Sequence, residues 1–331
     1  MPVRSAGGAG PDSSYPGGGS VADLGEFGVI ARVTAGRTLP PATLVGPGDD
    51  AAVVAAPDGR VVATTDVLVE GVHFRLDWST PHQVGRKAVA ANLADVAAMG
   101  AVPTGLLVGL CCPEQTPVTT VEGLADGMWE EAARAGTGVV GGDVVRAPKI
   151  VVSITALGDL QGRVPVTRSG ARPGDVLGVC GRLGWSAAGL AVLSRGFRSP
   201  TTVVGAHRVP EPPYEAGPQA AAAGATAMID VSDGLLADAG HLAAASGVRI
   251  DIDSAALTVP RRLVEVASAL GADPQHWVLT GGEDHALLAC FPAGCALPAG
   301  WAAIGSVLDG RAVTVDGMPY DGPKGWDHFG S

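Results

Sequence analysis

Short apolar runs and longer mixed segments alternate along the first half of the chain, and their lengths predict strands and helices. The short runs are rich in Val and Ile, lie between turn residues and predict strands at 53–57, 60–69, 103–110, 137–142 and 150–158. Residues 81–99 predict a helix, with Pro81 in its first turn, Gly100 after its end, and Asn92 and Asp95 on one face. Residues 21–36 and 119–135 predict two further helices.

The second half repeats this alternation after the Gly/Pro-rich stretch 168–175, where we place a domain boundary. Strands are predicted at 176–181, 226–230 and 248–253, helices at 186–195, 219–224 and 234–247, a Pro-rich loop at 198–213, and a strand, turn and strand over 277–291. Alternating strands and helices predict an α/β or α+β fold. We expect a disordered tail at 1–20, an N-terminal domain at 21–168 and a C-terminal domain at 169–331.

Composition narrows the class of protein. Of 331 residues, 47% are hydrophobic and 17% charged, and the net charge of −11 argues against nucleic acid or an anionic membrane as a partner. The five cysteines form no CxxC pair, which disfavours a zinc site and suits reduced thiols in a cytoplasmic protein. The first 20 residues lack the apolar region of a signal peptide, and no apolar run reaches the roughly 18 residues that span a bilayer.

Acidic residues directly follow short apolar runs in a recurring pattern. They are Asp66, Asp143, Asp230, Asp233, Glu283 and Asp284, and Asp95 adds a carboxylate on the face of the helix 81–99. Ligands of open α/β sheets bind where strand ends meet, so we expect these acids to converge. Converging carboxylates repel unless cations lie between them, and Mg²⁺ is the usual partner of oxygen ligands and phosphates. Taken singly, each acid is explained as well by a turn or a solvated loop.

The stretch GPGDDAAVV at 46–54 raises the same question of what balances neighbouring carboxylates. Asp49 and Asp50 stand side by side in a Gly/Pro turn before an apolar run. Water alone can solvate such a pair, since Asp favours turns. Together with the other acids, this pair leads us to interpret the turn as directing Asp50 at metal ions, with Asp49 adjacent to it.

The metals would act on phosphate without a common phosphate-binding loop. The glycine pairs Gly141–Gly142 and Gly281–Gly282 allow backbone to approach a ligand closely. The chain has no GxxxxGK[ST] loop and no kinase-type glycine loop with its partner motifs. Phosphoryl transfer depends mainly on positioning and charge neutralisation, so a cluster of Mg²⁺ ions can support it.

Taken in order, these motifs resemble those of the thiamine-monophosphate kinase family. The resemblance covers nearly everything after residue 21, and parts of it extend to aminoimidazole ribonucleotide synthetase, selenophosphate synthetase and a hydrogenase maturation protein. The matching stretches are GEFGVIAR (25–32), GPGDDAAVV, TTDVLVEGVHF (64–74), KAVAANLADVAAMGAVP (87–103), VVGGDVVRAP (139–148), VTRSGARPGD (166–175), IDVSDGLLADAGHL (229–242), LTGGEDHALL (279–288) and GWDHF (325–329).

This resemblance implies a fold, an activity and a set of site residues. It implies an aminoimidazole ribonucleotide synthetase-like fold of two α/β domains, a homodimer built on the N-terminal domain, and Mg-assisted transfer of the γ-phosphoryl group of ATP to thiamine monophosphate. The implied metal ligands are Asp50, Thr64, Thr65, Asp66, Asp95, Asp143, Asp230 and Asp233. The implied ATP contacts are Gly142, Asp143, Arg168 and Ser232, and the implied substrate contacts are His73, Glu283 and Trp326. No general base is implied.

Alternatives remain open for several of these residues and for the activity. His73 and Trp326 fit a surface or packing role, Arg168 an exposed surface role, and Lys87 fits a phosphate contact as well as a salt bridge. The stretch 130–138 has no aromatic residue to hold the adenine, apart from Trp129 upstream. A sister ATP-using enzyme, such as aminoimidazole ribonucleotide synthetase, is one rival function. A non-catalytic protein that binds nucleotides or thiamine phosphates is the other.

Overall fold

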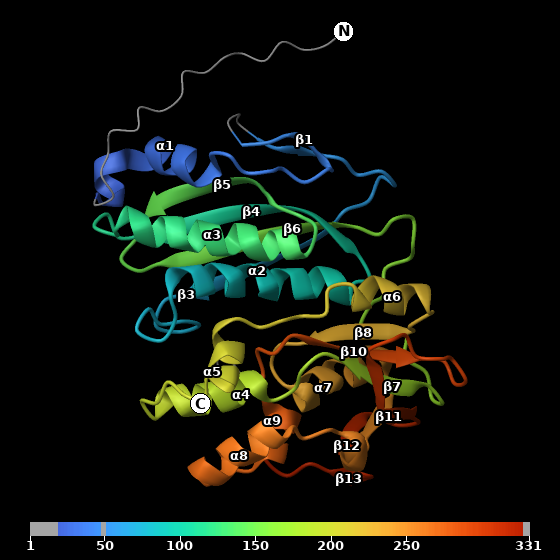
Figure 1. The fold of residues 1–331 in the computed structure, drawn as a ribbon. Helices are drawn as coiled ribbons and strands as arrows, with labels where there is room; N and C mark the ends of the chain where they lie inside the picture. The colour runs from blue at the N-terminus through green and yellow to red at the C-terminus, as the bar shows by residue number, and fades with distance from the viewer. Residues whose placement is uncertain (1–18, 48–50, 327–331) are drawn as a thin grey trace.

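The computed structural model describes residues 19–47 and 51–326, which fold into two halves, each built on its own β-sheet (Figure 1). The elements of the first half are α1 (Val21–Thr34), β1 (Thr43–Val45), β2 (Val53–Val54), β3 (Val62–Val69), α2 (Pro81–Ala98), β4 (Val102–Cys112), α3 (Val118–Arg134), β5 (Val139–Arg146) and β6 (Val151–Asp159). The predicted α/β fold class is therefore confirmed. Asp49 and Asp50 lie outside the described residues.

The sheet of the first half has four strands in the order β3-β6-β4-β5. β6 pairs antiparallel with both neighbours and alternates strictly between buried and half-buried residues, as a strand with one covered face must. β5 pairs parallel with β4. Helices α2 and α3 pack together on one side of this sheet, and α1 contacts both α3 and the edge strand β5 (Figure 1).

Helix α2 begins and ends where its sequence predicts. The Thr80 hydroxyl accepts a hydrogen bond from Gln83 N at 3.2 Å, the Gln83 side chain accepts one from Thr80 N at 3.0 Å, and Pro81 fills the first turn. Gly100, with φ +73°, follows the helix in the left-handed conformation that ends helices. α2 also contacts β8 and α6 of the second half, so it forms the floor of the junction between the halves.

The second half holds a seven-stranded sheet in the order β13-β12-β9-β11-β7-β10-β8. All its pairs are antiparallel except β12 with β9. Its elements are β7 (Val176–Cys180), α4 (Trp185–Ser194), α5 (Thr201–Arg208), α6 (Ala216–Ala222), β8 (Ala227–Val231), α7 (Leu235–Ser246), β9 (Arg249–Ile252), the short 3₁₀ helix η1 (Ser254–Ala256), α8 (Arg261–Leu270), α9 (Pro274–Thr280), β10 (Ala286–Phe291), β11 (Trp301–Leu308), β12 (Ala312–Val315) and β13 (Met318–Pro319).

A small-residue contact joins the halves. Ala97 and Ala98 of α2 share one buried cluster with Ala216 and Ala220 of α6. A Cβ atom on Gly217 would lie 1.9 Å from the Ala97 carbonyl oxygen, so only glycine allows the two helices to approach this closely. The two halves are therefore packed against each other through backbone-close contacts near α2.

Two predicted segments of the second half are wrong in part. Residues 277–280 form the end of α9 rather than a strand, because Pro274 occupies the first turn and the Asp273 side chain accepts a hydrogen bond from Gln275 N. The predicted loop 198–213 contains α5, which lies between prolines and contains none itself. The predicted domain boundary after residue 168 falls between β6 and β7 and stays a prediction. Within the described residues, none of the helices is long and apolar enough to cross a membrane.

Candidate active site

An open cleft of about 760 Å³ lies between the two halves and collects part of the predicted site. Thr64 of β3 and Asp95 of α2 line it from the first half, and Asp230 of β8 lines it from the second. Arg168, in the segment that connects the halves, also lines the cleft. The structure therefore brings together two carboxylates, Asp95 and Asp230, that are 135 residues apart in the chain, as the pattern of acids predicted.

Local hydrogen bonds aim the side chains of α2 and β3 at each other. The Thr64 hydroxyl donates to Asp95 Oδ2 at 2.7 Å, and the Asp66 backbone N–H donates to Asn92 Oδ1 at 2.9 Å. Asn92 is fully buried and donates its own amide to the Ala88 carbonyl at 2.9 Å. Asn92 therefore fixes the distance between β3 and α2. This also fixes the position of Asp95, which lies one turn further along the same face of α2.

Negative charge accumulates in the cleft. Burial and the charges of Asp230 and Asp66 together raise the pKa of Asp95 to about 6, against the hydrogen bond from Thr64, which lowers it. His285 partly compensates, since its Nδ1 lies 3.0 Å from Asp230 Oδ2. Burial lowers the pKa of His285, but the hydrogen bond to Asp230 and its charge raise it by more, so the net shift is upward. Oxygen ligands crowded in this way suit a hard divalent cation.

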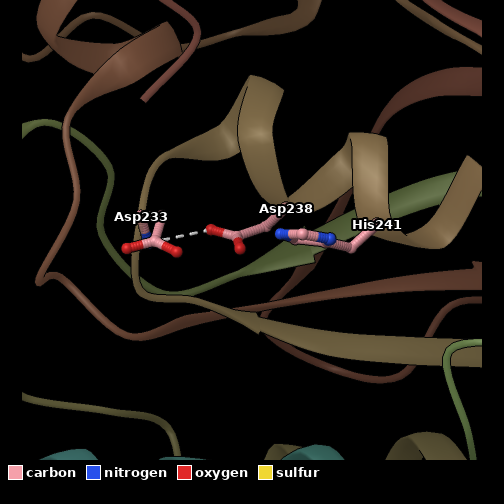
Figure 2. Close-up of side chains that lie close together, drawn as sticks. All are labelled: Asp233, Asp238 and His241. Carbon is pink, nitrogen blue, oxygen red and sulfur yellow. Dashed lines mark hydrogen bonds between the residues drawn. The ribbon is translucent and has the colours of Figure 1, made fainter. Parts of the chain in front are cut away.

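A second acidic group follows β8. Ligand atoms of Asp233, Asp238 and His241 all lie within 4.8 Å of one another, at the start of α7 (Figure 2). Asp238 Oδ2 accepts backbone hydrogen bonds from Asp233 at 3.1 Å and Gly234 at 3.0 Å, which ties the loop to the helix. Burial, followed by the charge of Asp230, raises the pKa of Asp238 to about 7. Ser232 lies in the same loop, and its carbonyl accepts a 2.7 Å hydrogen bond from Glu283 N.

Thr65 and Asp143 lie on the opposite face of the first sheet from Asp95. Side chains alternate along β3, so Thr64 and Asp66 face α2 while Thr65 faces away and meets the Thr155 hydroxyl at 3.3 Å. Asp143 shares this outer face, where it lines a second cavity of about 1100 Å³ together with Gly142. Pro47 and Ala51, the described neighbours of the GPGDDAAVV turn, line this cavity too. Within one chain, the first sheet thus separates Thr65 and Asp143 from the predicted metal ligands that line the cleft.

The expectation that the acids end strands is wrong for Asp66 and Asp143. Both lie inside their strands, opposite Ile154 and Gly109 respectively, because β3 and β5 continue past the acid to complete their pairing. Glu283 follows helix α9 rather than a strand. Which acids meet is therefore decided by the face of the sheet that each side chain occupies, and not by how close the acid lies to the end of its strand.

The predicted substrate residues lie near the β8 and α9 loops. Lys87 Nζ lies 2.8 Å from Glu283 Oε1 and donates to the His73 carbonyl at 3.1 Å, so the salt bridge foreseen as one alternative for Lys87 is present. Burial acts to raise the pKa of Glu283, but Lys87 and His207 lower it to about 2. Trp326 is 63% exposed, and its backbone N–H donates to the Asp233 carbonyl at 2.9 Å. Arg168 is exposed at the cleft.

Three residues of this region escaped the sequence reasoning. His285 and Asp238 lie within matching motifs, but the sequence suggested no role for either. His285 follows the predicted site residue Glu283 and contacts Asp230, and Asp238 accepts a hydrogen bond from the loop that contains Ser232 and Asp233. His207 was hidden in a segment predicted as loop. A histidine directly after a Gly-Gly-acid-acid turn was the one signal that could have singled out His285.

Comparison with known proteins agrees with this architecture. The family model of the AIR synthase related protein, N-terminal domain, matches residues 48–160, and that of the C-terminal domain matches residues 172–293. The chain is 58% identical to the thiamine-monophosphate kinase of Mycobacterium tuberculosis, over 93% of this chain and 92% of that one. It is 45% identical to the thiamine-monophosphate kinase of Corynebacterium glutamicum, over 96% and 97% of the two chains.

A solved structure extends the comparison to three dimensions. The structure of AaThiL complexed with AMPPCP and TMP superposes with a TM-score of 0.77 and 35% sequence identity, covering 93% of this chain and 98% of that one. Two AIR synthase related domains in tandem, with an acidic cleft between them, define the class of protein. Within that class, the chain belongs to the thiamine-monophosphate kinase family.

Proposed function

We propose that the protein transfers the γ-phosphoryl group of ATP directly to the phosphate of thiamine monophosphate, forming thiamine diphosphate and ADP. The observation that carries this proposal is the convergence of Thr64, Asp95 and Asp230 in one interdomain cleft, with Arg168 at its edge. Relatives that cover nearly the whole chain are thiamine-monophosphate kinases, and a similar structure is a complex with AMPPCP and TMP.

The residues of the cleft fit Mg²⁺ by their chemistry. The pKa of Asp95 is raised by burial and by the carboxylates of Asp230 and Asp66. A bound cation would relieve this charge repulsion. Oxygen donors of this kind are the ligands Mg²⁺ takes. Several Mg²⁺ ions would neutralise charge on the β- and γ-phosphates. We propose as their ligands the described residues Thr64, Thr65, Asp66, Asp95, Asp143, Asp230 and Asp233, and Asp50 outside them.

The remaining contacts divide between the two substrates. We propose Gly142, Asp143, Arg168 and Ser232 for ATP, with the Arg168 guanidinium supplying a planar pair of donors to phosphate. We propose His73, Glu283 and Trp326 for thiamine monophosphate, with the exposed Trp326 ring offering a face on which a cationic or heteroaromatic ring can stack. No protein group has to act as general base, because a phosphate monoester with a second pKa of about 6 is already a nucleophile.

Assembly and location are part of the same proposal. A homodimer would cover the outer face of the first sheet, where Asp143 lines an apolar-walled cavity. A second chain would then complete the group of ligands on that face. Five free cysteines within the described residues fit a cytoplasmic enzyme.

The test is an assay of the purified protein with ATP, Mg²⁺ and thiamine monophosphate, with thiamine diphosphate followed by chromatography. We expect turnover that EDTA abolishes. Binding of Mg·ATP without thiamine diphosphate formation would contradict the proposal and favour a non-catalytic binding protein. Turnover of formylglycinamidine ribonucleotide instead would favour a sister enzyme related to aminoimidazole ribonucleotide synthetase.

A further inference from the structure

Two buried groups from different halves of the molecule hold the Glu283 carboxylate. Lys87 Nζ of α2 lies 2.8 Å from Oε1, and His207 Nδ1 of α5 lies 3.3 Å from Oε2. The side chains of Lys87 and His207 are 6% and 8% exposed, whereas that of Glu283 is 35% exposed. The Glu283 carboxylate is therefore paired with two buried groups on one side, and its other side is accessible to solvent; we call this accessible side the open edge.

Lys87 connects two residues of the proposed substrate end. Besides its salt bridge to Glu283, its ammonium group donates to the His73 carbonyl at 3.1 Å. A buried ammonium group is costly unless it is paired and hydrogen-bonded, and both conditions are met here. The same group therefore fixes the Glu283 side chain relative to the backbone at His73.

His207 supports Glu283 from the other side. Its Nδ1 also lies 3.0 Å from the hydroxyl of Ser186, and Ser186 N donates to Asp284 Oδ1 at 2.9 Å. An ionised carboxylate can only accept, so a neutral His207 imidazole with its hydrogen on Nδ1 can donate toward Glu283 Oε2, 3.3 Å away. Ser186, at the start of α4, thus braces both His207 and the residue that follows Glu283.

The backbone of this loop is held in an unfavourable conformation. Glu283 and His285 have φ values of +64° and +53°, which side chains other than glycine rarely adopt. Such strain persists only where the surrounding contacts fix it, and it gathers at functional sites. The contacts from Lys87, His207 and Ser186 supply that fixation.

We propose that Lys87 and His207 are positioning residues that fix Glu283 as a hydrogen-bond acceptor for an amino group on a heteroaromatic ring of the substrate. This inference rests on the proposed function, in which the aminopyrimidine of thiamine monophosphate is that group. Because Lys87 already balances the charge of Glu283, the open edge recognises a donated hydrogen more than a net positive charge. The pair would then set selectivity for the substrate ring and leave ATP binding alone.

The experiment measures kinetics of Lys87→Met, His207→Leu and His207→Asn with thiamine monophosphate and with oxythiamine monophosphate, whose ring carries a carbonyl in place of the amino group. We expect Lys87→Met and His207→Leu to raise the KM for thiamine monophosphate ~10-fold or more and to erase the preference over the oxo analogue, as loss of a polar contact does. The KM for ATP should change less than ~2-fold. General damage to the fold would instead raise the KM for ATP together with the KM for thiamine monophosphate. His207→Asn keeps a donor near the Nδ1 position and should restore most of the preference.

Four outcomes overturn the inference. They are an unchanged KM and preference in a folded Lys87→Met protein, equal rises in both KM values, loss of melting temperature with no kinetic change, and no rescue by His207→Asn. If the wild type forms no thiamine diphosphate, the proposed function fails separately. Calorimetric titration of thiamine monophosphate in the presence of Mg·AMPPCP then decides, because wild-type binding that Lys87→Met weakens supports the inference, and equal or absent binding contradicts it.

Discussion

At the residue scale, the site is organised by buried carboxyl groups whose surroundings are short of positive charge. Asp284 is the extreme case, at 4% exposure. Its Oδ1 accepts from Ser186 N, while Oδ2 has no hydrogen-bond partner within the described part of the chain. Burial raises the pKa of Asp284 to about 7, against the backbone hydrogen bonds that lower it. Ionising this group therefore costs stability.

The Asp284→Asn variant tests this cost through its pH dependence. The folded pKa of about 7 lies above the unfolded value of 3.8, so wild-type stability should fall as pH rises from about 4 to about 7. Asparagine keeps the acceptor for Ser186 and cannot ionise. In urea denaturation, we expect the stability of Asp284→Asn relative to wild type to rise by ~3 kcal/mol between pH 5 and pH 8, because about two units of the upward pKa shift lie in that window.

The exposed Asp309→Asn variant is the control, because it removes one acid without relieving burial. A pH-independent difference between Asp284→Asn and wild type would contradict the assigned cause. The measurement should be made in EDTA, so that metal binding at Asp230 and its neighbours does not add its own pH dependence.

Sequence reasoning reached some residues of the site and not others. The sequence placed Asn92 and Asp95 on one helix face and predicted that Asp95 meets the acids of the strands, and the hydrogen bonds show that this face meets β3. The pairing of His207 with Glu283 joins residues 76 positions apart through a helix that was predicted as a loop. Such contacts are set by tertiary packing, which local patterns do not encode.

At the element scale, the crossing of α2 and α3 determines where the face of Asp95 points. A Cβ on Gly85 would lie 2.0 Å from the Leu124 carbonyl oxygen, and one on Gly127 would lie 1.9 Å from the His82 carbonyl oxygen. The two helices therefore meet backbone to backbone at two glycines. This close crossing holds α2 against the sheet.

Alanine at either glycine should force the helices apart. We expect Gly85→Ala and Gly127→Ala each to lower the free energy of unfolding by ~2 kcal/mol or more, the usual cost of overpacking. Gly240→Ala is the matched control, because Gly240 lies inside α7 with nothing within 4 Å of the point where a Cβ atom would lie, and alanine favours helix by ~1 kcal/mol. Chemical denaturation checks all three, and a neutral Gly85→Ala would refute the close crossing.

Element prediction succeeded where several signals agreed. For α2, Pro81, the pattern of one helix face and the following glycine all marked the same helix, and the structure has it at Pro81–Ala98. For 277–280, a short apolar run alone favoured a strand, although Asp273 and Pro274 marked a helix start. Short apolar runs are ambiguous without such flanking signals.

At the scale of the whole molecule, the outer face of the first sheet is the feature that a single chain leaves incomplete. Val67, Leu107 and Val145 are 45%, 37% and 46% exposed there. Val67 pairs in register with Ser153, and Asp143 lies in the same row through Gly109. An apolar face of this kind is typical of an interface.

We predict a dimer that buries this face. Sedimentation at micromolar concentration should give the dimer mass for wild type and a shift toward monomer for Val67→Lys, because an unpaired ammonium group would be buried in the interface. The Val264→Lys variant, at a 46%-exposed position on α8 of the other half, should remain dimeric. A monomeric wild type would contradict the predicted homodimer.

The central claim is that the interdomain carboxylates act through Mg²⁺ in phosphoryl transfer. Its most direct test is the rate of thiamine diphosphate formation as a function of Mg²⁺ concentration, for wild type, Asp95→Asn and the surface variant Asp309→Asn. We predict that Asp95→Asn lowers the rate ~100-fold and shifts half-saturation to ~10-fold higher Mg²⁺, while Asp309→Asn matches wild type. A folded Asp95→Asn protein with the wild-type rate and the wild-type Mg²⁺ dependence would contradict the claim.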